Sequence, residues 1–141
     1  MDSAATQTAV QPASPNRRLR VETVALAAGR ALVALLFILA GVAKIRTPQP
    51  FLDHMTEFGV PTFLLPAVIA LELGAGLALL IGWRVRDAAA ALAVFCVMTA
   101  VIFHRQLSIH TEVTLFLKDL AIAGGLLATS ASAAALARRQ D

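Results

Sequence analysis

The sequence predicts an all-α integral membrane protein built as a four-helix bundle. Hydrophobic residues make up 58% of the 141 residues and charged residues only 15%, whereas a soluble domain is nearer half apolar and a quarter charged. The mean hydropathy is +0.75. A chain of this length cannot hide so much apolar surface in one core. The long apolar runs therefore belong in a bilayer, where helices satisfy their own backbone hydrogen bonds.

Four apolar segments are predicted to cross a membrane, although the third is short and needs the flanking Arg86 and Arg105 to reach the interfaces. The first covers 24–43, and its 20 residues reach about 30 Å as a helix, which matches the hydrocarbon thickness of a bilayer. The second covers 62–83 and is interrupted only by Glu72. The third covers 88–103 and the fourth 113–137. We expect these spans to form one transmembrane domain.

Polar ends flank this domain, which we expect to cover 21–137. Residues 1–20 are predicted to be a disordered cytoplasmic tail, because the stretch is largely small and polar, and 138–141 form a basic end. Positive charge near the two ends and the middle turn exceeds that on the other side, which places both termini in the cytoplasm. This predicts a multi-pass protein of the cytoplasmic membrane. The seven inner cations are Arg17, Arg18, Arg20, Arg84, Arg86, Arg138 and Arg139, against Lys44, Arg46 and Arg105 outside.

The connection between the first two spans contains a short amphipathic segment, "PFLDHMTEFG". Its apolar residues recur at helical spacing and its polar residues take the other face, which is typical of a helix. We expect this helix to lie in the outer membrane interface, and Gly59 and Pro61 to end it. The apolar positions are Phe51, Leu52, Met55 and Phe58.

Glu72 lies near the middle of the second span. The eleven Leu, Ile, Val and Phe residues of this span supply about −3 to −6 kcal/mol on the insertion scale, against about +3 kcal/mol for one carboxylate. The span therefore inserts, but an intramembrane acid usually has a partner. Counting the rise per residue from the inner boundary puts Arg30 about 9 Å deep and Glu72 about 16 Å deep. This predicts an Arg30–Glu72 pair; a neutral, protonated Glu72 is the alternative, because burial disfavours the charged form.

A second group of polar residues is expected nearer the outer side. His104, Lys118 and Asp119 fall about 20–25 Å above the inner boundary, and Lys44 falls near 30 Å. Gly76, one turn from the intramembrane acid, permits close helix contact or leaves a slot for a flat ligand. The alternative is that such charges only fix the packing register of the bundle. The candidate site residues are Arg30, Lys44, Glu72, Gly76, His104, Lys118 and Asp119.

Read in order, several segments resemble the DoxX family of small four-helix membrane proteins. They are "GRALVALLFILAGVAKIRTP", "FGVP", "ALELGAGLALLIGWRVRDAAAAL", the "FH" that ends the third span, and "FLKDLAIAGGLL". Together they cover nearly all of 29–127. In "ELGAG" the chain has Ala75 where family members often have two adjacent glycines, which makes a slot there tighter. The residues that carry the resemblance are Arg30, Gly41, Lys44, Pro61, Glu72, Gly76, Gly82, Arg86, His104, Lys118 and Gly125.

The resemblance implies a protein of the cytoplasmic membrane, and some relatives are subunits of quinone-reducing sulfur oxidoreductases or partners of soluble redox enzymes. We therefore expect a membrane subunit or anchor of a redox complex, with a quinone-binding site in which the candidate residues bind or relay protons. The sequence has no self-sufficient catalytic motif, no pair of cysteines and no histidine spacing that indicates a metal site.

Two other functions stay open at this point. In a proton-coupled transporter of a small solute, Glu72 would carry the proton, and so narrow a bundle would act as a homodimer. A non-catalytic membrane assembly factor needs no ligand at all. Nucleic-acid binding is not expected, because the arginines stand in small groups between apolar runs and form no basic stripe.

Overall fold

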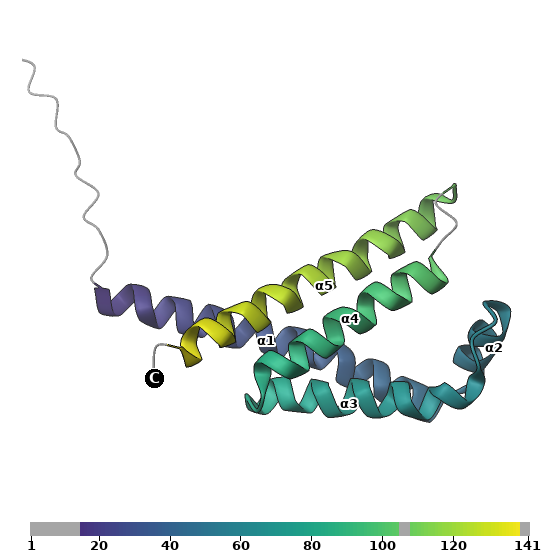
Figure 1. Ribbon diagram of the computed structural model, residues 1–141, viewed down its shortest axis with the longest axis horizontal. Helices are drawn as coiled ribbons and strands as arrows, with labels where there is room; N and C mark the ends of the chain where they lie inside the picture. The colour runs from purple at the N-terminus through teal and green to yellow at the C-terminus, as the bar shows by residue number, and fades with distance from the viewer. Residues whose placement is uncertain (1–14, 105–107, 139–141) are drawn as a thin grey trace, which may run out of the picture.

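The computed structural model describes residues 15–104 and 108–138, and this part of the chain contains helices and turns but no strand (Figure 1). The all-α prediction is confirmed, and so is the short helix between the first two spans. The elements are α1 (Pro15–Arg46), α2 (Gln49–Glu57), the 3₁₀ turn η1 (Thr62–Leu64), α3 (Leu65–Ile81), α4 (Val85–Phe103) and α5 (His110–Ala137).

Four helical segments of the described chain are long and apolar enough to cross a membrane. They measure 27, 20, 19 and 28 residues and cover Arg20–Arg46, Thr62–Ile81, Val85–Phe103 and His110–Ala137. Many of their large apolar side chains face outward, and Leu32 is 70% exposed and Ile81 73% exposed. Outward-facing aliphatic side chains on all four segments are stable in lipid but unfavourable in water. The fold is that of a multi-pass membrane protein.

The helix ends differ from the predicted ends for local reasons. The helix α1 begins at Pro15, so 15–20 of the predicted tail are helical, whereas 1–14 and 139–141 lie outside the described residues. The helix α3 stops at Ile81 because Gly82 takes the left-handed conformation, with φ of 80°, which is the usual helix C-cap of glycine. After α2, Gly59 does the same with φ of 70°, as the sequence predicted.

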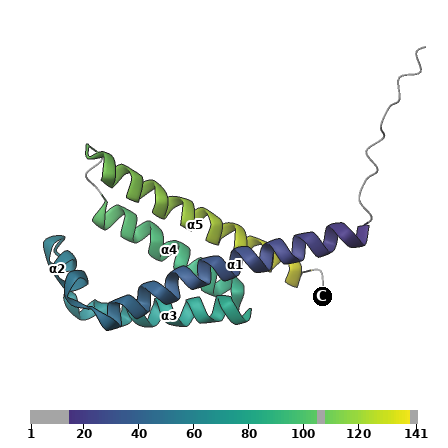
Figure 2. The ribbon, with the colours of Figure 1, turned by 180° about the vertical axis from the view of Figure 1, so that it is seen from behind.

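The helices form two packed pairs, α1 with α3 and α4 with α5, joined through contacts between α3 and α4. The two pairs lie close together near the α3–α4 turn and diverge toward the end that carries α2 (Figures 1 and 2). The start of α1 and the end of α5 lie toward the same end of the bundle, away from α2 (Figure 1). An even number of spans requires this arrangement; that this end is cytoplasmic stays a prediction.

Two glycines set the register of α1 against α3. A Cβ built on Gly41 would lie 2.8 Å from Cδ2 of Leu73, and one built on Gly76 would lie 3.0 Å from Cγ1 of Ile38 and 3.3 Å from the carbonyl oxygen of Ala34. Such close approach of two helices is the usual role of small residues in membrane bundles. The buried core continues from this contact into α4 and α5 and includes Phe37, Leu79, Leu92 and Leu126.

Candidate functional site

The register of α1 against α3 places Arg30 far from Glu72. A Cβ built on Gly82 would lie 3.4 Å from Nη2 of Arg30, whereas one built on Gly41 would lie 3.5 Å from Cβ of Glu72. Gly82 is ten residues beyond Glu72, so Arg30 is about 15 Å away along the helix axis. The predicted Arg30–Glu72 pair is wrong. The depth count assumed that the first two spans end level, but α1 continues past the α3–α4 turn.

Glu72 pairs instead with Lys44, one helical turn beyond Gly41 on α1. Nζ of Lys44 donates to Oε1 of Glu72 at 2.8 Å, and the two side chains are only 14% and 4% exposed. The other carboxylate oxygen, Oε2, is buried and has no hydrogen-bond partner among the described residues. Nζ of Lys44 also lies 4.8 Å from the ring centroid of Phe51 on α2, a cation–π geometry. This leaves one buried acceptor of the pair free for a ligand.

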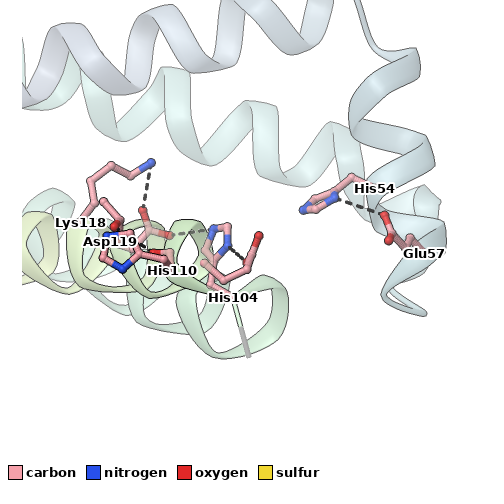
Figure 3. Close-up of polar contacts among 8 residues, drawn as sticks. His54, Glu57, His104, His110, Lys118 and Asp119 are labelled. Atoms are coloured by element: carbon pink, nitrogen blue, oxygen red, sulfur yellow. Dashed lines mark hydrogen bonds and ion pairs between the residues drawn. The ribbon is translucent and has the colours of Figure 1, made fainter. Parts of the chain in front are cut away.

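The structure brings together the second predicted group, His104, Lys118 and Asp119 (Figure 3). Nδ1 of His104 lies 2.9 Å from Oε2 of Glu112, and its Nε2 lies 3.7 Å from Oδ2 of Asp119. Nζ of Lys118 lies 3.8 Å from Oδ1 of Asp119, and the lysine side chain is 55% exposed. The imidazole is thus held between two carboxyl groups.

The Lys44–Glu72 pair and the group of His104, Lys118 and Asp119 line the same cavity, which has a volume of about 560 Å³ and lies between the two helix pairs. Four long helices and α2 contribute to its walls, which are mostly apolar and include Phe37, Leu65, Phe95, Cys96 and Ile122. Five of the seven candidate residues line it: Lys44, Glu72, His104, Lys118 and Asp119. The other two do not, because Arg30 lies at the opposite end of α3 and Gly76 packs against the backbone of α1.

An aromatic cluster lies beside the cavity where α2 meets the end of α4. The ring of His54 stacks on Phe103 with centroids 4.9 Å apart and an interplanar angle of 21°. Phe58 meets His54 and Phe103 with centroid distances of 4.9 Å and 5.4 Å. His54 also lies 3.8 Å from Glu57 (Figure 3). The helix α2, which the sequence predicted between the first two spans, therefore forms a wall of the site.

Sequence reasoning overlooked three residues that contribute to this site, namely His54, Phe51 and Glu112. For Glu112 the signal was present, because Glu112 and Asp119 are seven residues apart and lie on one face of α5. His54 and Phe51 could not be placed, because nothing in the local pattern says how α2 folds back over the bundle.

The arrangement can bind a mostly apolar molecule that carries a few polar atoms. A cavity of several hundred Å³ with apolar walls and a small number of convergent polar groups is the usual form of a small-molecule site. Lys44 supplies a donor, Oε2 of Glu72 an acceptor, and His104 an imidazole backed by two carboxyl groups. Within the described chain, no three His, Cys, Asp or Glu side chains are arranged to hold a metal ion.

Comparison with known proteins agrees with this architecture. The family model of DoxX matches residues 25–105. The chain is also similar to the inner membrane protein YqjF of Escherichia coli strain K12, with 40% identity over 108 residues, which cover 77% of this chain and 83% of that protein. No solved structure matches the chain. These matches cover most of the bundle, and the chain therefore belongs to the DoxX family of membrane proteins.

Proposed function

We propose that the protein is the membrane subunit of a redox complex and that its cavity binds the head group of a quinone. The buried, unpartnered Oε2 of Glu72 beside the Lys44 ammonium is the observation that carries the proposal. A buried acceptor without a partner costs free energy unless a ligand satisfies it. An apolar ring with oxygen atoms on opposite sides fits a cavity whose few polar groups stand apart on apolar walls.

Different residues of the cavity contact the quinone and its reduced form. A bound quinone would take up two electrons from the partner enzyme and two protons. Lys44 donates a hydrogen bond to a ring carbonyl oxygen, and Oε2 of Glu72 accepts one from a ring hydroxyl. His104, with Glu112 and Asp119 beside it, exchanges protons with the bound ring, as a positioned imidazole does in general acid–base chemistry.

The first test measures quinone that co-purifies with the protein in mild detergent. We expect wild type to carry quinone and the double variant His104→Ala, Lys118→Ala to carry about tenfold less, because the substitutions remove two of the few polar side chains that line the cavity. The matched control is Glu22→Gln, an exposed acid outside the cavity, which should carry the wild-type amount. Wild type that carries no more quinone than the double variant would rule out the site.

A second test separates the two redox forms. Glu72→Gln keeps an oxygen that accepts from Lys44 but replaces the free acceptor by an NH₂ donor. Affinity for a short-chain quinol should therefore fall about tenfold, while affinity for the matching quinone is kept. Ligand-induced shifts of the melting temperature under anaerobic conditions measure both. Equal losses for the two forms would contradict the assigned role of Glu72.

The two rival functions give different results in the same variants. A proton-coupled transporter requires uptake into vesicles that depends on a proton gradient and is abolished by Glu72→Gln. An assembly factor requires that the charge-removing variants change the amount of the partner enzyme but leave its specific activity unchanged. Either result, obtained with a protein that binds no quinone, would replace the proposal.

A further inference from the structure

A second cavity of about 390 Å³ lies at the opposite end of the bundle and is lined by three arginines. Arg30 reaches it from α1, and Arg84 and Arg86 reach it from the turn and first residues of α4. The hydroxyl-bearing residues Thr129 and Ser132 of α5 contribute to its wall. The apolar part of the wall includes Leu26, Val85 and Leu136.

The positive charge of this arginine cavity is not balanced by the protein. Nε and Nη2 of Arg84 donate to Oδ2 of Asp87 at 2.9 Å and 2.7 Å. Neither Arg30 nor Arg86 forms an ion pair with any carboxylate of the described residues. Nε of Arg30 is buried and has no hydrogen-bond partner in that same part of the chain. Two guanidinium groups thus face the cavity without a counter-charge.

Local backbone structure holds these cations in place. Gly82 lies directly beside the guanidinium of Arg30, since a Cβ there would lie 3.4 Å from Nη2. Arg84 takes the left-handed conformation, with φ of 45°, directly before α4. The hydroxyl of Ser130 donates to the carbonyl oxygen of Arg86 at 2.9 Å and ties this residue to α5. The first N–H groups of α4 add the positive end of a helix dipole to the same place.

We propose that the arginine cavity binds a phosphate group, with the head group of an anionic phospholipid as the expected source. The planar fork of a guanidinium suits the oxygens of phosphate, and here the arginines approach from two different helices. The cavity lies where α3 and α4 meet at the end of their spans, so a lipid head group is at the right depth. Basic pockets between spans on the cytoplasmic side are known sites for anionic lipid head groups.

This site is separate from the proposed quinone cavity. Gly82 and Glu72 are ten residues apart on α3, about 15 Å along the axis, and the two cavities share no lining residue. Quinone binding and phosphate binding can therefore succeed or fail independently.

The experiment uses the purified full-length protein in detergent and counts bound lipids by native mass spectrometry. Phosphatidylglycerol is compared with neutral phosphatidylcholine. We expect wild type to retain phosphatidylglycerol preferentially, and Arg86→Gln and Arg30→Gln each to reduce that retention about tenfold, because each removes charge-assisted hydrogen bonds. Arg46→Gln is the matched control, because Arg46 is an exposed cation at the other end of α1 and its loss changes the net charge equally.

A second arm distinguishes a lipid from free phosphate. Inorganic phosphate that raises the melting temperature of wild type and Arg46→Gln, but not of Arg86→Gln, would support the site with a soluble phosphate as its source. Arg86 is exposed, so its substitution is expected to leave the fold intact, and an unchanged elution volume checks this. The proposal is overturned if all variants retain the anionic lipid equally and phosphate stabilises none of them, or if all lose it equally.

Discussion

Replacing Lys44 by methionine tests whether the buried pair with Glu72 couples α1 to α3. The two charged atoms are 2.8 Å apart, and the side chains are 14% and 4% exposed. With an effective dielectric constant of about 20, Coulomb's law gives an attraction of about 6 kcal/mol at this separation. Part of this attraction offsets the free energy needed to remove water from the two charged groups. Removing one partner of a buried pair lowers the stability by about 3–5 kcal/mol. The folding equilibrium of Lys44→Met should therefore fall by a factor of at least about one hundred.

A double-mutant cycle makes this reasoning refutable. Reversible unfolding in mixed micelles, followed by far-UV circular dichroism, gives the stability of Lys44→Met, Glu72→Leu and the double variant. Because the double variant leaves no unpaired charge, it should recover to within about 1 kcal/mol of wild type. Lys118→Met is the control, since its side chain is 55% exposed, and should change stability by less than about 0.5 kcal/mol. Additive losses in the double variant would show that Lys44 and Glu72 are not coupled.

Three further predictions follow from the packing and the topology. Gly76→Ala should lower the free energy of unfolding by about 1–3 kcal/mol, because its Cβ would lie 3.0 Å from Cγ1 of Ile38. Gly74→Ala is the control and should be neutral or stabilising, because a Cβ there meets nothing within 4 Å. Equal melting temperatures of the two variants would contradict the register of α1 on α3. Cys96 is 4% exposed, so maleimide should label it slowly in intact membranes and fully after denaturation in SDS, and rapid labelling of the folded protein would show that the α4 face is open. Reporter fusions at the two chain ends should both give the cytoplasmic signal, and opposite signals would exclude a bundle of four spans.

The sequence alone predicted the elements of this fold well. The four spans, the short helix after the first span and the glycine that ends it all follow from hydropathy, helical spacing and the conformational freedom of Gly59. These properties are local, so each segment shows them without any knowledge of the helices against which it packs. The ends were less accurate because helices continue beyond the apolar window, and α1 begins at Pro15, about two and a half turns before the predicted span.

The candidate site was predicted in part. The depth count correctly predicted that His104 lies near Asp119, because α4 and α5 follow each other in the chain and pack against each other, so an error of a few residues in either helix matters little. The same count failed for Glu72, which lies mid-span. There, a shift of α1 along its axis relative to α3 decides whether Arg30 or Lys44 lies level with the carboxylate. The partner is Lys44 and not Arg30, and no property of either segment by itself distinguishes them.

The sequence by itself determined that this chain is a membrane bundle with ionisable side chains inside it. Only the tertiary structure decided which of those side chains meet, that α2 covers one cavity, and that Arg30 belongs to a second cavity with Arg86. The physical reason is that insertion into lipid depends on the composition of each segment, whereas pairing depends on the register between segments. In this protein that register is set by the contacts of Gly41 and Gly76 with the facing helices.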